Sequence, residues 1–166
     1  MQSGESQLKT FFISMLATGF GAGYSPFAPG TFGSLVGVAI FLLVQGVSPV
    51  LYILIVLLVT LVGIPISGAA ESVFGEKDSQ KIVIDEIAGQ MIALFAVVAI
   101  GGVEPYSARF GILVIAGFVL FRIFDIWKPY PVKNFEKLGG GAGVMLDDVA
   151  AGLYALLFLS IAIALV

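Results

Sequence analysis

Residues 50–70 read VLYILIVLLVTLVGIPISGAA, an uninterrupted apolar stretch of 21 residues. About 20 such residues are enough for one helix to cross the hydrocarbon core of a bilayer. The apolar character extends well beyond this stretch, because the 61 residues from Thr10 to Ala70 contain no Asp, Glu, Lys or Arg. A surface exposed to water would carry charges over such a length, so we expect lipid to be the solvent around this part of the chain.

Composition supports the same conclusion for the whole chain. Hydrophobic residues make up 59% and charged residues 11% of it, whereas a soluble domain carries about 25% charged residues. The sequence predicts an integral membrane protein with one domain spanning residues 1–166. The absence of Cys and His excludes disulfides and any chemistry based on thiolate or imidazole groups. With a net charge of -3 and no basic cluster, a nucleic-acid partner is also excluded.

We predict an all-α fold, a polytopic membrane helix bundle of four or five spans. The predicted spans cover residues 35–45, 50–70, 87–101, 109–122 and 149–166. The first is short for a core of about 30 Å, so four spans with a re-entrant hairpin is the alternative. Residues 1–9 are polar and predicted to be frayed.

A segment rich in glycine and proline precedes the first predicted span. Residues 19–34 read GFGAGYSPFAPGTFGS. Gly costs about 1 and Pro about 3 kcal/mol in a helix interior, so we predict a loop or re-entrant segment here. An interfacial or half-spanning helix is expected just before it.

The positions of the basic residues predict the orientation. With these spans, seven of the eight Lys and Arg residues lie on the same side as the N-terminus, including Lys9, Lys133 and Lys137. Only Arg109 lies on the opposite side, together with the acid Glu104. The positive-inside rule then places the polar stretches 71–86 and 122–148 on the cytoplasmic face.

Acidic residues concentrate in these two polar stretches. Asp85 and Glu86 precede the span at 87, and Asp147 and Asp148 precede the span at 149. As acids at helix starts, they would be favoured by the helix dipole by about 0.3–1 kcal/mol. However, two acidic pairs together with Asp125 would repel one another unless cations neutralise them. Without His or Cys, such oxygen ligands suit Mg²⁺, Mn²⁺ or Ca²⁺.

Two basic residues accompany Asp125. Arg122, Asp125 and Lys128 are spaced i, i+3 and i+6, so they can share one helical face. The spacing fits a salt bridge between Arg122 and Asp125 that anchors the helix end, and it also fits a pair of cations that binds phosphate.

The glycine-rich segment also has two interpretations. Its backbone N–H groups and hydroxyls could surround a phosphate, with Ser25, Gly30, Thr31 and Ser34 as candidates. Alternatively, its small residues, such as Gly33 and Gly37, could allow close helix packing. Combined with the acids and cations on one membrane face, the segment suggests metal-assisted phosphoryl chemistry on a phospholipid headgroup.

Four segments resemble a known family in sequence and in order. They are GFGAGYSPFAPGTFGS, IVIDEIAGQ, FRIFDIWKPYP and GGGAGVMLDDVAAG, at residues 19–34, 82–90, 121–131 and 139–152. They resemble the signature segments of bacterial phosphatidylglycerophosphatase A. The resemblance implies a Mg²⁺-dependent phosphatase at the bacterial inner membrane that converts phosphatidylglycerophosphate into phosphatidylglycerol. Its partner would be this phospholipid, and a homo-oligomer is possible.

The resemblance also implies roles for individual residues. The expected metal ligands are Asp85, Glu86, Asp125, Asp147 and Asp148. Arg122 and Lys128 lie beside these acids in the same motifs. Our own hypothesis for the reaction makes Glu86 the base for direct attack by water, with Asp125, Asp147, Arg122 and Lys128 as the other catalytic residues. In this hypothesis the phosphate contacts Arg122, Lys128 and the glycine-rich segment at Ser25, Gly30, Thr31 and Ser34.

Two other classes of membrane protein also use acidic residues and are alternatives to the phosphatase. A CDP-alcohol phosphotransferase also uses acids at a membrane face, but its DxxDGxxAR…GxxxDxxxD pattern is absent. A small cation channel or transporter predicts acids in the middle of spans. Here, the acids are predicted in loops or at span ends, which favours the enzyme.

Overall fold

The computed structural model describes residues 4–100, 103–135 and 138–165, and this part of the chain contains helices and no strand. The all-α prediction is therefore confirmed. The helices are α1 (Gly4–Ala17), α2 (Pro29–Val44), α3 (Pro49–Phe74), α4 (Ile84–Ala99), α5 (Ala108–Trp127), α6 (Val132–Phe135) and α7 (Gly140–Leu165), with a short 3-10 turn, η1 (Ala22–Tyr24).

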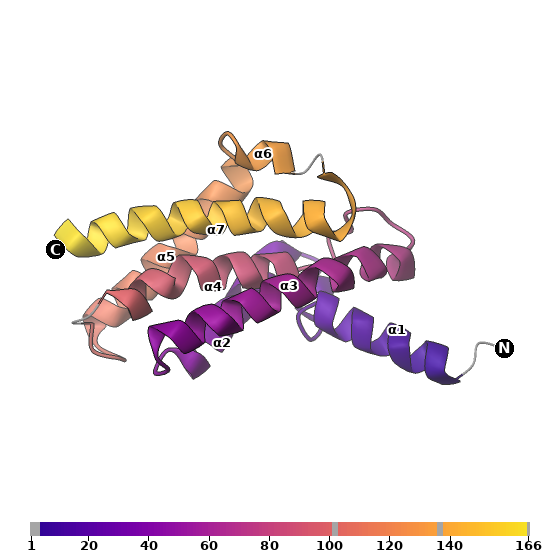
Figure 1. The fold of residues 1–166 in the computed structure, drawn as a ribbon, viewed down its shortest axis with the longest axis horizontal. Coiled ribbons are helices and arrows are strands. Elements are labelled where there is room, and N and C mark those ends of the chain that lie inside the picture. The colour runs from indigo at the N-terminus through magenta and orange to yellow at the C-terminus, as the bar shows by residue number, and fades with distance from the viewer. Residues whose placement is uncertain (1–3, 101–102, 136–137, 166) are drawn as a thin grey trace.

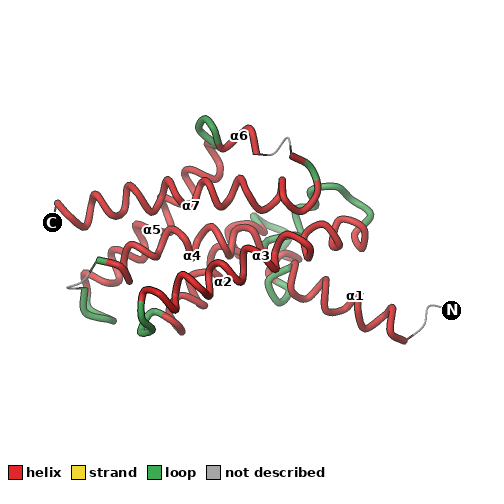
Figure 2. Tube along the Cα trace, in the orientation of Figure 1, coloured by secondary structure: helices red, strands yellow, loops and turns green. Residues whose placement is uncertain are grey.

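The long helices form a bundle whose connections lie at its two ends (Figures 1 and 2). Helices α2, α4 and α7 begin at one end, and α3 and α5 end there. Helix α1 extends outward from this same end, while the C-terminus lies at the other (Figure 1). We call the end that holds the starts of α2, α4 and α7 the polar end.

Within the described part of the chain, three helices are long and apolar enough to cross a membrane: α3 with 26 residues, α5 with 20 and α7 with 26. They contain the predicted spans 50–70 and 109–122 and the described part of 149–166. The predicted spans 35–45 and 87–101 correspond to α2 and α4, which have 16 residues each and are therefore about 24 Å long. Gly101, Lys137 and Val166 lie outside the described residues.

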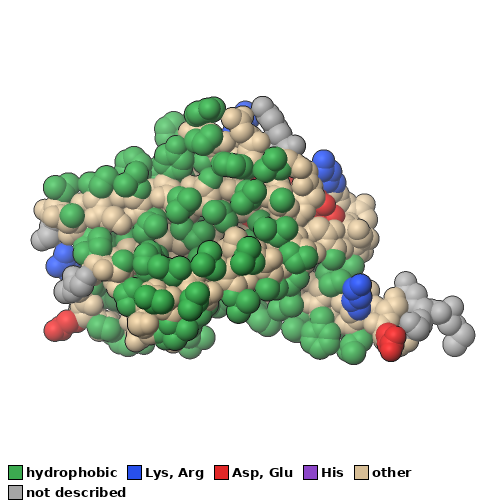
Figure 3. All heavy atoms as spheres, viewed as in Figure 1, with side chains coloured by type: hydrophobic (Ala, Val, Ile, Leu, Met, Phe, Trp, Pro, Cys, Tyr) green, Lys and Arg blue, Asp and Glu red, His purple; other side chains and the backbone are tan. Residues whose placement is uncertain are grey.

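The surface has the pattern expected of a membrane protein. Hydrophobic side chains cover the middle of the bundle, and charged side chains appear near its two ends (Figure 3). Arg109 and Glu104 belong to the end where α4 leads into α5, away from the other cations. The grouping of charges expected from the sequence is thus retained in three dimensions.

Several helices begin earlier than the sequence predicts. Helix α1 starts at Gly4, so the described part of residues 1–9 is helical. The glycine-rich loop ends at Ala28, because Pro29 occupies the first turn of α2, a position that its fixed φ angle favours. Helix α7 starts at Gly140, so the prediction that all acids lie in loops or at span ends is wrong for Asp147 and Asp148.

Helix α4 lies at the centre of the bundle and is packed against α2, α3, α5 and α7. Its closest neighbour is α7, at a point where both helices have glycine. A methyl group added at Gly152 would lie 2.5 Å from the Gly89 carbonyl oxygen. Small residues let helix backbones approach closely inside a membrane. The Gly89–Gly152 contact therefore sets the separation between α4 and α7.

Replacement of Gly89 with alanine tests this contact. The new methyl group would lie 2.5 Å from the Phe121 ring and 2.6 Å from the Asp148 carbonyl oxygen. We expect a loss of about 1–3 kcal/mol in the free energy of unfolding, measured by thermal or SDS-induced unfolding in detergent.

Gly111→Ala is the matched control, because nothing lies within 4 Å of the added methyl group. Alanine is the better helix former, so this control should be neutral or slightly stabilising. Equal stabilities of the two variants would contradict the close-packing interpretation.

Candidate active site

The contact between Gly89 and Gly152 brings the two acidic pairs together. Asp85 lies one turn before Gly89 on α4, and Asp148 lies one turn before Gly152 on α7. Both helices run away from the polar end, so residues one turn before the contact also meet. Carboxylate oxygens of Asp85, Glu86 and Asp148 all lie within 4.8 Å of one another.

Two of these three carboxylates have a buried oxygen that receives no hydrogen bond in the described structure. Asp148 is only 3% exposed, and among the described residues Asp85 Oδ1 and Glu86 Oε2 are buried without a hydrogen-bond partner. Like charges this close in a shielded site repel strongly unless a cation binds them. The set consists only of oxygen donors, which is the chemistry that Mg²⁺ prefers, so the residues present fit this ion.

Arg122 joins helices α5 and α2 at the edge of the cluster. Its Nη1 atom lies 2.7 Å from Asp125 Oδ2 and donates a hydrogen bond of 3.3 Å to Ser34 Oγ. The salt bridge considered for Arg122 and Asp125 is therefore present. The carboxyl group of Asp125 also contacts Asp148, so α5 completes the acidic cluster.

Lys128 holds the remaining acid. It ends α5 with a left-handed backbone, φ 46°, and its Nζ atom lies 2.7 Å from Asp147 Oδ2. Asp147 also accepts a hydrogen bond of 3.1 Å from the Asp148 backbone N–H. It lines a polar cavity of about 290 Å³ that is also bounded by Lys77 and Asp78 of the loop between α3 and α4. Asp147 is therefore the acid of the pair that faces this cavity.

Part of the predicted phosphate cradle contacts the cluster. A methyl group added at Gly30 would collide with Glu86 Oε1 and lie 3.2 Å from Arg122 Nη1. Ser34 lies one turn further along α2, where it donates a hydrogen bond of 2.9 Å to the Gly30 carbonyl. Gly30 and Ser34 therefore support Glu86 and Arg122 from the side of α2.

Two members of the predicted cradle lie elsewhere. Ser25 donates a hydrogen bond of 2.8 Å to the Phe27 carbonyl within its own turn and lines a separate cavity with Gln80 and Lys81. Thr31 lies in the first turn of α2, and the described contacts do not join it to the acids. The structure thus brings Gly30 and Ser34 to the cluster, but not Ser25 and Thr31.

Gln90 is a polar residue of this region that sequence reasoning missed. It is fully buried on α4, one turn beyond Glu86, and in the described structure neither atom of its amide has a hydrogen-bond partner. A signal was present, because Gln90 closes the IVIDEIAGQ segment and comes just before an uncharged apolar run.

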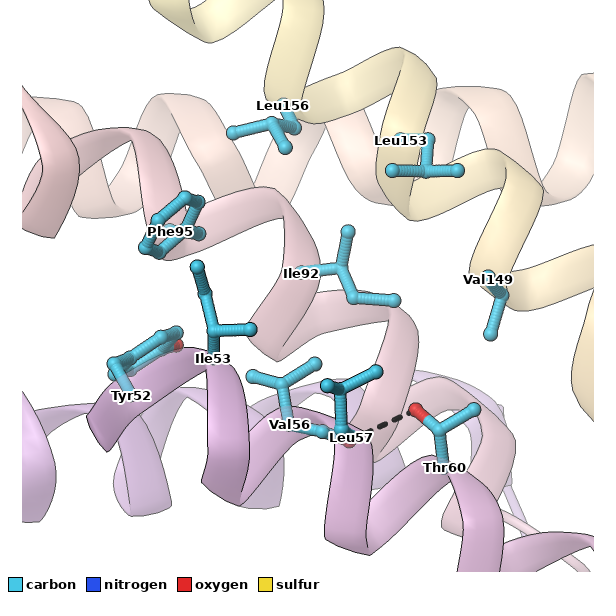
Figure 4. Close-up of a pocket in the computed structure, with 10 residues that line it drawn as sticks. All are labelled: Tyr52, Ile53, Val56, Leu57, Thr60, Ile92, Phe95, Val149, Leu153 and Leu156. Atoms are coloured by element: carbon cyan, nitrogen blue, oxygen red, sulfur yellow. Dashed lines mark hydrogen bonds between the residues drawn. The ribbon is translucent and has the colours of Figure 1, made fainter. Parts of the chain in front are cut away.

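A second cavity, of about 250 Å³, is apolar and lies between α3, α4 and α7 (Figure 4). Its few polar groups already have partners: the Tyr52 hydroxyl donates to the Met91 carbonyl at 2.9 Å, and the Thr60 hydroxyl donates to the Val56 carbonyl (Figure 4). Its lining includes no acid and no cation. This cavity therefore differs from the site at the polar end, where the clustered acids lie.

Fold and site together define a class of protein, a membrane-embedded helical bundle with a cluster of acids and two cations at one end. Comparison with known families makes this specific. Residues 15–163 match the family Phosphatidylglycerophosphatase A. The chain belongs to this family, which confirms the resemblance seen in its sequence motifs.

Two relatives carry the name of the family, and a third carries the name of another lipid phosphatase. The chain is 38% identical to phosphatidylglycerophosphatase A of Escherichia coli, over 83% of this chain and 76% of the relative. It is 38% identical to phosphatidylglycerophosphatase A of Haemophilus influenzae, over 87% and 85%. A protein of Bacteroides thetaiotaomicron named "putative phosphatidylinositol-3-phosphatase" is 41% identical over 92% and 94%. No solved structure matches the chain.

Replacement of Gly30 with alanine tests the support from α2. The methyl group would displace Glu86 and Arg122, so we expect phosphatase activity to fall by roughly 100-fold while the protein remains folded. Phosphate release and thermal unfolding in detergent measure the two effects. Gly46→Ala, with nothing within 4 Å of the added methyl group, should retain activity. Full activity of Gly30→Ala would show that α2 does not position the site.

Proposed function

We propose that this protein hydrolyses the terminal phosphate monoester of phosphatidylglycerophosphate, releasing inorganic phosphate and phosphatidylglycerol. One observation carries the proposal: three carboxylates cluster at the polar end of a membrane bundle, two of them with an unpaired oxygen, and Arg122 and Lys128 pair with the neighbouring acids Asp125 and Asp147. Membership of the phosphatidylglycerophosphatase A family supports phosphatidylglycerophosphate as the substrate.

The proposed cofactor is Mg²⁺, held by Asp85, Glu86 and Asp148, with Asp125 and Asp147 beside them. When bound, the ion would supply positive charge to the phosphate oxygens and to the oxygen of the leaving group. The fit rests on the all-oxygen donor set and on the unpaired carboxylate oxygens.

Arg122 and Lys128 are proposed to orient the phosphate. Both cations already contact carboxylates, Asp125 and Asp147, which hold them in place before the substrate arrives. Arg122 Nε is buried without a partner in the described structure, so this N–H group is available as a donor to an anion. Guanidinium groups suit such directional contacts with phosphate oxygens.

Direct attack by water is the proposed step. The oxygen of the water forms a bond to phosphorus while the bond from phosphorus to the glycerol oxygen breaks. One proton of the water passes to Glu86, and the departing glycerol oxygen takes up a proton to become the hydroxyl of phosphatidylglycerol. Glu86 has two carboxylate oxygens, so one can serve the ion while the other takes the proton; Oε2 suits the role of base because it has no hydrogen-bond partner in the described structure.

An activity assay with and without metal tests the proposed substrate and cofactor. Purified protein in detergent should release inorganic phosphate from phosphatidylglycerophosphate when Mg²⁺ is present, and excess EDTA should abolish the release. Restored activity on addition of Mg²⁺ controls for damage by the chelator. Full activity in EDTA would contradict the metal proposal. Phosphatidylinositol-3-phosphate, tested in parallel, examines the substrate named for the Bacteroides relative.

A variant of one proposed ligand sharpens this test. Asp148→Asn keeps the size of the side chain but removes a charge from the cluster, so activity should fall at least about 100-fold and more Mg²⁺ should be needed for half-maximal rate. Glu104→Gln, at the opposite end of the bundle, is the control. It should retain wild-type activity and the wild-type Mg²⁺ concentration for half-maximal rate. An unchanged Mg²⁺ requirement in Asp148→Asn would remove Asp148 from the proposed ligands.

We also propose that the polar end faces the cytoplasm of a bacterial inner membrane, because it gathers most of the cations. The chain has no native cysteine, so single introduced cysteines can be labelled cleanly. In intact cells, Lys133→Cys should resist a membrane-impermeant thiol reagent, whereas Glu104→Cys should react. The reverse pattern would invert the orientation.

A further inference from the structure

Gln90 has a buried side-chain amide without hydrogen-bond partners in the described structure. Its side chain is 0% exposed, and neither Nε2 nor Oε1 has a hydrogen-bond partner among the described residues. Burying an amide without partners is unfavourable, and buried polar side chains are normally satisfied by protein or by ordered water. A ligand of small size is therefore expected beside Gln90.

The position of Gln90 indicates where this ligand lies. Gln90 follows Glu86 by four residues on α4, so their Cβ atoms are about 5–6 Å apart on one helical face. The two side chains are therefore neighbours on α4. Glu86 itself has an unpaired oxygen, Oε2, as the nearest candidate on the same face.

Helix α2 closes this region from the side. A methyl group added at Gly37 would lie 2.9 Å from Gln90 Cβ, and one added at Gly30 would collide with Glu86 Oε1. The same α2 face thus covers both residues. One turn beyond Gln90, Leu94 is fully buried in an apolar cluster. The polar region therefore ends at Gln90.

The chemistry of the unpaired groups selects the ligand. Gln90 offers a donor and an acceptor, whereas an ionised Glu86 offers only acceptors. A water molecule can accept from the Gln90 amide and donate to Glu86 Oε2 at the same time. We propose that Gln90 is a positioning residue that holds a water against Glu86. This inference rests on the proposed function, in which Glu86 takes a proton from the attacking water.

Cysteine accessibility tests for the water without measuring catalysis. In a chain lacking native cysteine, Gln90→Cys should react with a small hydrophilic thiol reagent in detergent, and inorganic phosphate should slow the reaction. Leu94→Cys, one turn deeper on α4, is the matched control and should react at least tenfold more slowly. Equal, slow labelling at both positions would overturn the proposal, because a dry site at Gln90 holds no water.

Kinetics test the positioning role. Gln90→Met keeps the length of the side chain but removes both hydrogen-bonding groups, so kcat should fall at least about tenfold. Because Arg122 and Lys128 remain, KM and inhibition by inorganic phosphate should stay near wild type. Thr60→Val, a polar-to-apolar control on the apolar cavity, should keep wild-type kcat. Wild-type kcat in Gln90→Met would overturn the inference.

The experiments distinguish failure of the proposed phosphatase function from failure of the proposed role of Gln90. The assay uses whichever lipid phosphate monoester the wild type hydrolyses, with phosphatidylglycerophosphate first. A wild type that hydrolyses none of them contradicts the proposed function, while the cysteine labelling still decides whether water reaches Gln90. An active wild type with an equally active Gln90→Met contradicts the inference alone.

Discussion

The close contact between Gly89 of α4 and Gly152 of α7 is the constraint on which the site depends. A side chain at either position would separate the two helices, because the added carbon would lie only about 2.5 Å from atoms of the neighbouring elements. Asp85 and Asp148 each precede this contact by one turn on helices that run in the same direction. The distance between the acidic pairs is therefore set by residues that have no polar function.

The charges at the polar end divide into two groups. Asp125 and Asp147 each have a cation at 2.7 Å, whereas Asp85, Glu86 and Asp148 form the closely spaced trio. Two cations cannot balance five carboxylates, and the uncompensated charge falls mainly on the trio. Beside an apolar bundle, where water screens poorly, such a trio strongly favours binding a divalent cation over remaining ionised alone. The salt bridges and the proposed cation site are thus complementary parts of one charge balance.

Much of this arrangement could be predicted from the sequence. Long apolar stretches predicted the helices of the bundle, and the grouping of Lys and Arg predicted a single polar end. The short distance in sequence between Arg122 and Asp125 made their salt bridge foreseeable. Helix boundaries were harder, since Pro29 starts a helix inside a segment that reads as a loop, and the glycines before Asp147 extend α7 by two turns.

Pairings between distant segments could not be predicted. Arg122 meets Ser34 across 88 residues of sequence, and Lys128 meets Asp147 across 19. Both depend on how three helices pack, which no local pattern specifies. The unpaired Gln90 amide could not be predicted either. The sequence shows a glutamine at the start of an apolar run, but only the structure shows that its side chain is buried without hydrogen-bond partners.

The depth of the site explains why a lipid headgroup suits it. Asp85 and Glu86 lie in the first turn of α4, whereas Asp147 and Asp148 are the eighth and ninth residues of α7, about 10 Å from its start. The first two turns of α7 therefore rise beyond the acids and border the polar cavity above Asp147. A phosphate at the end of a lipid headgroup can reach this level while its acyl chains stay in the bilayer.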